Sequence, residues 1–146
     1  MTWHDGQPFT ADDVVFTWQY VSDPNSAAVS LGTYLPIDFV EKLGELEVRV
    51  TFKEPTLNWS SPWSNNNGMI LPRHVFEPYK GKEARNAPAN LKPVGTNAYK
   101  LVEFRPDDIV LAEINPHYHI ENRPFFDRIE LKGGGDAAGA ARALSP

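Results

Sequence analysis

The sequence predicts a mixed α/β or α+β fold, and two patterns carry this prediction. The first is a capped amphipathic helix that begins near residue 11, and the second is a set of short strands that form hairpins. Short helices interleaved with antiparallel hairpins are typical of α+β and mixed α/β domains. The 146 residues include 10 glycines and 13 prolines, which favours short elements joined by loops over a helical bundle.

The predicted helix has a clear start and a clear end. Thr10 is a good N-cap, because its hydroxyl can accept a hydrogen bond from a free N–H group of the first turn. Asp12 and Asp13 place negative charge at the positive end of the helix dipole. We expect the helix to end before the turn residues 22–25. Its predicted apolar stripe, which would put Trp18 in the core, comprises Ala11, Val14, Val15, Trp18 and Val21.

The best strand signal lies at residues 46–52. Leu46, Val48, Val50 and Phe52 alternate with Glu47, Arg49 and Thr51, and a turn at Gly44 joins this strand to residues 39–43. Residues 99–104 and 109–114 predict a second hairpin. The remaining predicted elements are a strand end at 3–6, a brief strand at 69–72, a short helix from Pro72 to 76, a long loop at 77–97, a strand at 129–132 and a helix at 137–144 capped by Asp136.

Composition excludes several classes of function. The net charge of −5 provides no source for the electrostatic attraction that drives nucleic-acid binding. The absence of cysteine excludes thiol catalysis and cysteine-ligated metals. The sequence has no apolar run long enough to predict a membrane-spanning helix. No catalytic serine, zinc-protease or phosphate-loop motif occurs, so we expect no enzymatic activity and no cofactor.

Two groups of polar residues are candidates for chemical sites. His117 and His119 could place two imidazoles on one face of a strand, as a metal site requires, but a surface loop after Asn115 is the favoured interpretation, and we predict no metal. The paired acids Asp12–Asp13 and Asp107–Asp108 fit a helix start and a hairpin turn better than a pair of glycosidase carboxylates.

Sequence blocks at residues 3–14, 94–101, 111–118 and 126–131 together resemble the extracellular solute-binding proteins of ABC transporters that bind peptides, dipeptides, nickel or related solutes. The first block reads Trp-His-Asp-Gly-Gln-Pro-Phe-Thr-Ala-Asp-Asp-Val, and the second reads Val-Gly-Thr-Asn-Ala-Tyr-Lys-Leu. The order and spacing of the blocks extend across nearly the whole chain. The chain departs from the pattern at 97–98, where the family usually has Gly-Pro, at Ile114, where it has Arg or Lys, and at His119, where it often has an aromatic residue.

The resemblance implies a partial lobe of a periplasmic binding protein-like II fold. On this basis, residues 1–146 are a single fragment of the first lobe, and the second lobe is absent. Residues 1–90 would form a small subdomain, and residues 91–146 would supply strands and the start of a helix to the main lobe. The intact protein would be periplasmic or extracellular and membrane-associated, and it would deliver a peptide or a similar small solute to the ABC permease subunits.

The candidate ligand-contacting residues are Tyr34, Trp63 and Asn66. Aromatic rings and amides suit a peptide backbone or a sugar, and the resemblance implies that the segments holding Tyr34 and Trp63 face the solute cleft. Core packing of both rings is the alternative. A carbohydrate-active enzyme or its accessory sugar-binding domain is the competing function. Apolar surface left open on a partial lobe also predicts a homo-oligomer.

Overall fold

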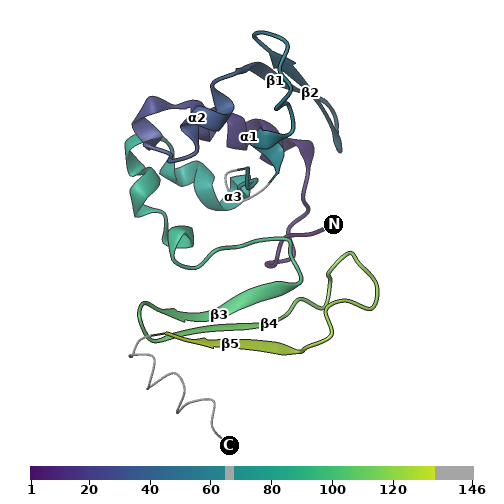
Figure 1. Ribbon diagram of the computed structural model, residues 1–146, viewed down its shortest axis with the longest axis vertical. Helices are drawn as coiled ribbons and strands as arrows, with labels where there is room; N and C mark the ends of the chain where they lie inside the picture. Colours follow the sequence, from purple (N-terminus) through teal and green to yellow (C-terminus); the bar gives the residue numbers. More distant parts are fainter. Residues whose placement is uncertain (65–67, 134–146) are drawn as a thin grey trace, which may run out of the picture.

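The computed structural model describes residues 1–64 and 68–133, and it confirms the predicted mixture of helices and antiparallel strands (Figure 1). A helical part with a two-stranded hairpin is followed by a separate three-stranded sheet. Its elements are α1 (Ala11–Ser22), η1 (Pro24–Ser26), α2 (Leu31–Tyr34), β1 (Ile37–Gly44), β2 (Glu47–Phe52), η2 (Ser61–Trp63), α3 (Arg73–Phe76), η3 (Glu77–Tyr79), η4 (Gly81–Asn86), η5 (Pro88–Asn90), β3 (Tyr99–Arg105), β4 (Ile109–Ile114) and β5 (Arg128–Lys132).

Helix α1 begins as predicted. The Thr10 hydroxyl accepts a hydrogen bond from the N–H group of Asp12, and the Asp13 carboxylate accepts one from the Thr10 N–H group. This reciprocal arrangement is a capping box. The buried face of α1 includes Ala11 and Val21 of the predicted stripe but is otherwise shifted from it. Phe16 and Tyr20 are buried in the core, whereas Val14, Val15 and Trp18 are only half-buried.

The hairpin of β1 and β2 has the predicted inward and outward faces. Val48 and Val50 are half-buried and pack against the core, while Glu47 and Arg49 are exposed. Leu46 is the exception, because it lies in the turn rather than in the strand and is 80% exposed. The amphipathic pattern therefore predicts the strand correctly but extends one residue too far.

Two other sequence predictions are wrong. Residues 69–71 form no strand but a connecting segment, whose Leu71 N–H group donates to the Thr17 hydroxyl of α1 at 2.8 Å. Residues 77–97 are not one long loop, because the 3-10 helices η3, η4 and η5 lie within them. Prolines occupy the first turns of η3 and η5, where a missing N–H group costs no helical hydrogen bond. The helix predicted at 137–144 lies outside the described residues.

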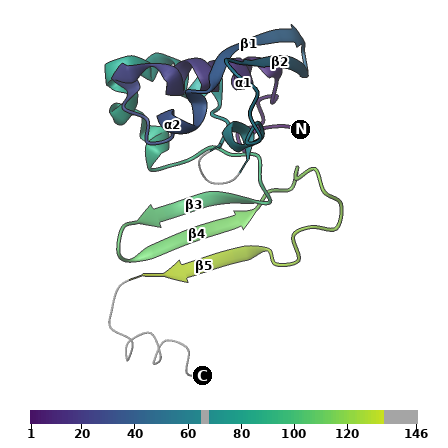
Figure 2. The same ribbon diagram turned by 45° about the horizontal axis from the view of Figure 1, so that its top comes forward.

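The second sheet has the strand order β3–β4–β5, with both pairs antiparallel, and lies apart from the helical part (Figure 2). Directly paired residues share a face of an antiparallel sheet. One face carries two apolar rows, whereas charged residues dominate the other face. The apolar rows are Leu101–Ala112–Ile129 and Phe104–Val110–Leu131; the rows of the other face are Lys100–Glu113–Arg128, Glu103–Leu111–Glu130 and Arg105–Ile109–Lys132.

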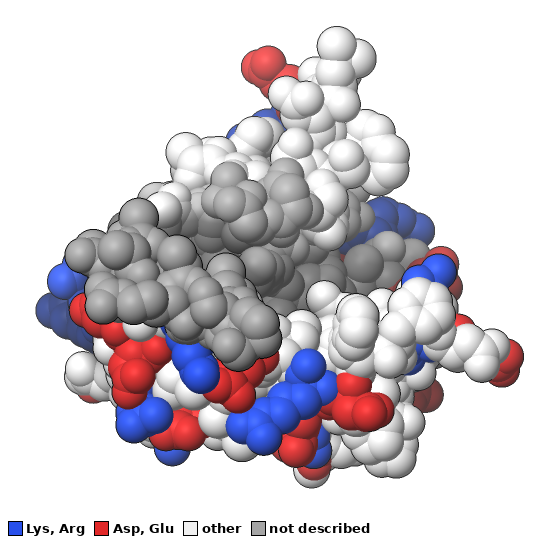
Figure 3. All heavy atoms as spheres, turned by 60° about the horizontal axis from the view of Figure 1, so that its bottom comes forward, with Lys and Arg blue, Asp and Glu red and all other residues white. Residues whose placement is uncertain are grey.

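The apolar face of this sheet is incompletely covered. Leu131 is 59% exposed, and no member of its two apolar rows is fully buried. Acidic and basic groups are interspersed over the surface shown in Figure 3. None of the helices in residues 1–64 and 68–133 has the length and apolar character needed to cross a bilayer.

Candidate functional site

A hollow of about 500 Å³ lies where three distant parts of the chain meet. The N-terminal segment contributes Trp3 and Phe9. The segment between β2 and α3 contributes Trp63 and residues 68–72, and the segment before β3 contributes residues 93–97. Its walls are mainly apolar and aromatic. Hollows of this size and character are typical of small-ligand sites. Two of the sequence blocks that carry the family resemblance, at 3–14 and 94–101, thus meet at one place.

Trp63 is the wall residue that the sequence predicted to contact ligand, and the structure brings it against Tyr34. The two ring centroids are 5.6 Å apart, and the ring planes cross at 86°, an edge-to-face contact. Tyr34 is only 1% exposed, so its ring backs Trp63 and is itself covered. Asn66 lies outside the described residues. Trp59, in the same stretch of sequence, points away from the core and is 63% exposed.

The polar atoms of this aromatic pair are buried. Within the described part of the chain, neither the Tyr34 hydroxyl nor the Trp63 Nε1 atom has a hydrogen-bond partner. Burial raises the pKa of Tyr34 to about 12, because the phenolate would lose its hydration. Tyr34 therefore stays a neutral phenol over the whole physiological pH range.

The Asp13 side chain fixes the walls of the hollow. It is buried, and its carboxylate accepts hydrogen bonds from Trp3 Nε1 at 3.3 Å, from the Thr10 N–H group at 2.9 Å and from the Arg73 N–H group at 2.8 Å. These bonds join the N-terminal segment and the start of α3 to helix α1. The sequence predicts Asp13 only as a helix-start residue, and no local pattern indicates that it also positions Trp3.

The ring of His4 connects the N-terminal segment to the other wall. The backbone N–H group of His4 donates to the Gly95 carbonyl at 2.8 Å, and the Gly95 N–H group donates to the Nδ1 atom of the His4 ring at 3.2 Å. Its Nε2 atom lies 2.9 Å from the Asn97 carbonyl, so the neutral ring carries its proton on Nε2 and donates it there. A Cβ atom at position 95 would lie 3.3 Å from the His4 Cε1 atom, so Gly95 permits this close approach.

A second histidine stabilises the same N-terminal turn. His74 Nε2 lies 2.6 Å from an Asp5 carboxylate oxygen. Partial burial would raise the pKa of Asp5, but the hydrogen bond from His74, assisted by the Gln7 N–H group and the His74 charge, outweighs it and lowers that pKa. Neither His4 nor His74 was a site candidate in the sequence. Only their positions after folding, 91 and 69 residues from their partners, reveal these contacts.

The other polar candidates occupy structural positions. His117 and His119 lie in the loop between β4 and β5, and both are exposed. Asp107 and Asp108 lie in the β3–β4 turn, where Asp107 has a φ of 60°, a conformation that Asp tolerates better than most residues. Residues 1–64 and 68–133 contain no group of three or more metal-binding side chains. The arrangement around the hollow suits non-covalent binding.

The described residues thus form an aromatic hollow on an α+β fold, and hollows of this kind are typical of non-covalent small-molecule sites. The family model for bacterial extracellular solute-binding proteins, family 5, matches residues 1–145, and the chain belongs to this family. The oligopeptide-binding protein AppA of Bacillus subtilis is 30% identical over 142 residues, which are 97% of this chain and 26% of AppA. The peptidoglycan-binding protein YepA of Agrobacterium fabrum is 29% identical over 80% of this chain and 18% of YepA.

Solved structures match the fold closely. B. subtilis AppA in complex with a nonapeptide superposes with a TM-score of 0.86 at 29% identity, covering 98% of this chain and 28% of AppA. Campylobacter jejuni NikZ, solved with Ni(L-His), gives a TM-score of 0.83 at 26% identity, covering 98% of this chain and 28% of NikZ. The chain spans about a quarter of the length of the relatives it matches. The fold is therefore a partial solute-binding domain of the family.

Proposed function

We propose that this chain forms part of the first lobe of a solute-binding protein that captures peptides or related small solutes for an ABC transporter. The observation that carries the proposal is the meeting of two of the four family sequence blocks, at 3–14 and 94–101, at one aromatic hollow with Trp63 in its wall. Similarity to peptide-binding AppA over 97% of the chain supports this solute class. The protein acts by binding, without enzymatic chemistry.

The proposed division of labour follows the chain. Residues 1–90 act as a small subdomain, and residues 91–146 contribute strands to the main sheet of the lobe. Trp63 offers its ring to the solute, and Tyr34 supports that ring from behind. Asn66 supplies an amide to the same solute. A second lobe closes over the solute, as hinged binding proteins do, and the closed form docks on the permease subunits outside the cytoplasmic membrane.

A carbohydrate-active enzyme is the less favoured function, because the relatives are binding proteins of transport systems. Sugar as the solute is a separate question. A Thermotoga maritima family structure with bound mannohexaose superposes with a TM-score of 0.78 at 26% identity, covering 99% of this chain and 27% of that protein. An aromatic ring such as Trp63 suits either a peptide or a sugar.

Calorimetric titration of the 146-residue chain with di- to nonapeptides tests whether a second lobe is needed for tight solute binding. Because a cleft binder encloses most of its ligand between two lobes, we expect dissociation constants weaker than about 1 mM for this chain alone. A dissociation constant in the low micromolar range for any of these peptides would contradict the proposal that a second lobe completes the site. Release of reducing sugar from glycosides by the purified chain would contradict the non-enzymatic proposal.

A further inference from the structure

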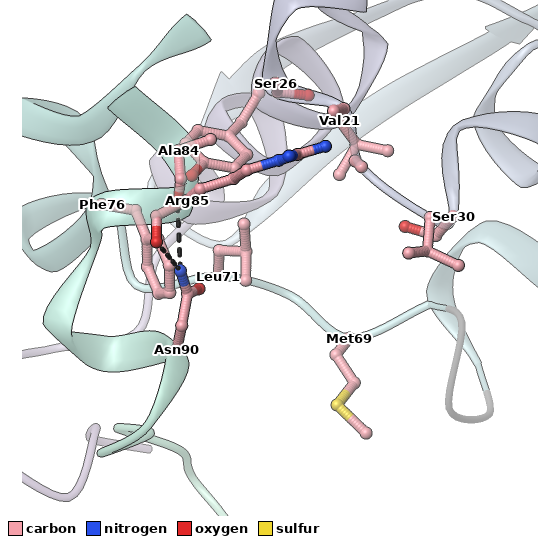
Figure 4. A pocket seen from close by; sticks show the side chains of 13 residues that line it. Val21, Ser26, Ser30, Met69, Leu71, Phe76, Ala84, Arg85 and Asn90 are labelled. Atoms are coloured by element: carbon pink, nitrogen blue, oxygen red, sulfur yellow. Dashed lines mark hydrogen bonds between the residues drawn. The ribbon is translucent and has the colours of Figure 1, made fainter. Parts of the chain in front are cut away.

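A second hollow, of about 320 Å³, lies on the helical part of the molecule (Figure 4). All its described lining residues fall between Tyr20 and Asn90. It lies next to the hollow lined by Trp3 and residues 93–97, with which it shares Met69, Leu71 and Phe76. Much of its surface is apolar. The apolar lining side chains include Val21, Met69, Leu71, Phe76 and Ala84.

Arg85 is the charged residue of this hollow. Figure 4 shows its side chain running across the hollow, with the guanidinium group toward Val21. The other arginines of the described residues each have a partner. Arg49, Arg73, Arg105 and Arg128 lie within 4 Å of carboxylates, and Arg123 lies over the ring of Phe125. Arg85 is an exposed residue, and within residues 1–64 and 68–133 it has neither kind of partner, so its charge is available to an anion that enters the hollow from solvent.

Tyr20 provides a second polar group. Its side chain lines the hollow, and only 7% of the residue is exposed. Burial raises the pKa of Tyr20, which keeps the phenol protonated and able to donate. Asn90 is already engaged, because its Nδ2 atom donates to the Ala84 carbonyl at 3.0 Å and to the Arg85 carbonyl at 3.3 Å.

We propose that this hollow is a binding site for a small amphipathic carboxylate. The carboxylate pairs with the Arg85 guanidinium and accepts from the Tyr20 hydroxyl, while an aliphatic or aromatic group packs against Val21 and Leu71. Guanidinium groups suit carboxylates because their planar donors match both oxygens. The C-terminal residue of a peptide and a free apolar acid share this chemistry. The site goes beyond the proposed function because it needs no second lobe.

An NMR titration of the ¹⁵N-labelled 146-residue chain tests the proposal with N-acetyl-leucine, 4-methylpentanoate and the uncharged N-acetyl-leucinamide. We expect the two carboxylates to shift the amide signals of Val21, Leu71 and Arg85, with dissociation constants on the order of 1 mM for ligands of this size. The uncharged amide should bind at least about tenfold more weakly. Stronger binding of N-acetyl-leucine than of 4-methylpentanoate would indicate a peptide end, and the reverse would indicate a free acid.

Matched variants separate this site from general charge effects. Arg85→Gln should weaken carboxylate binding about tenfold or more, and Tyr20→Phe should weaken it severalfold. Arg49→Gln removes an exposed arginine on β2, which already pairs with Glu41, and should leave binding unchanged. Equal binding by the uncharged amide, or unchanged affinity in a folded Arg85→Gln variant, would overturn the proposal. Both outcomes concern only the hollow lined by Arg85, so they test this proposal independently of the proposed role in peptide transport.

Discussion

The carboxylate of Asp13 accepts a hydrogen bond from the backbone N–H group of Arg73, 60 residues further along the chain, at 2.8 Å. The same carboxylate accepts hydrogen bonds from the Thr10 N–H group and from the indole N–H group of Trp3. One buried side chain thus sets the start of α1, the start of α3 and a wall of the aromatic hollow. All three partners donate hydrogen bonds to Asp13. A carboxylate has two acceptor oxygens for them, whereas the amide of Asn has one acceptor oxygen and a donor NH₂ group.

Replacing this carboxylate tests its structural role. Asp13→Asn would turn an NH₂ group toward an N–H donor and leave buried groups unsatisfied, so we expect a loss of about 2–3 kcal/mol in the free energy of unfolding. Asp12→Asn is the matched control, because Asp12 is partly exposed and its ion pair with Lys42 contributes less than about 1 kcal/mol. Urea denaturation checks both, and equal midpoints for the two variants would count against the prediction.

Tyr34→Phe should be neutral or stabilising by up to about 1 kcal/mol at pH 7, because it removes a buried hydroxyl without a described partner. The pKa of Tyr34 is raised to about 12 in the folded protein, above the unfolded value near 10. The folded state therefore holds this proton more tightly, and the resulting stability is present below pH 10 and declines as the pH rises toward 12.

Urea denaturation at pH 7 and pH 11 measures this difference. The original protein should lose more stability between the two pH values than Tyr34→Phe does. Tyr118→Phe, at a half-exposed ring, serves as the control. If Tyr34→Phe shows the same alkaline loss as the original protein, the burial of the Tyr34 phenol is not the cause.

The lowered pKa of Asp5 predicts acid sensitivity with a defined sign. Its ordinary value is 3.8, and the folded value lies below it, so the ionised carboxylate stabilises the fold above about pH 4. This contribution is lost as the pH falls through the folded pKa. We expect His74→Gln to raise the pKa of Asp5, as measured by carboxyl ¹³C chemical shifts. His117→Gln is the control, and an unchanged Asp5 titration in His74→Gln would remove the histidine from the explanation.

The uncovered apolar face of the β3–β5 sheet predicts self-association of the 146-residue chain. Sedimentation velocity should show a dimer or a higher oligomer at high micromolar concentration, since open sheet edges and apolar faces favour pairing. Leu131→Lys adds a charge to the apolar face and should shift the chain toward monomer. Glu130→Lys changes the opposite face and should not. A monomer for the original chain at this concentration would contradict the prediction that the apolar face of the β3–β5 sheet drives self-association.

The sequence predicted local structure best where one pattern decided it. The Thr10 cap, the alternation at Val48 and Val50, and both hairpins depend on neighbours in the chain, and the structure confirms them. The buried face of α1 was predicted only in part, at Ala11 and Val21, because helical spacing alone does not decide which of several apolar faces is buried. Tertiary contacts instead bury Thr17, whose hydroxyl donates to the Asp13 carbonyl and accepts from the Leu71 N–H group, beside the aromatic residues Phe16 and Tyr20.

The candidate site was harder to predict, for the same reason. The sequence left open whether Tyr34 and Trp63 face the solute or pack in the core, and it did not predict that the two rings touch or that Tyr34 is only 1% exposed. His4 bonds to Asn97, 93 residues away, and Asp13 bonds to Arg73, 60 residues away, as well as to nearer partners. Such contacts depend on the packing of whole segments, and no local spacing rule encodes them.

The role of this chain in solute capture can be tested in the frame of a relative. We would replace the matching segment of B. subtilis AppA with residues 1–146 and titrate the chimera with a nonapeptide by calorimetry. We predict a folded chimera that binds the peptide, and a Trp63→Ala variant that binds it at least about tenfold more weakly, whereas Trp59→Ala binds it normally. A folded chimera with no peptide binding, or one indifferent to Trp63→Ala, would contradict the account.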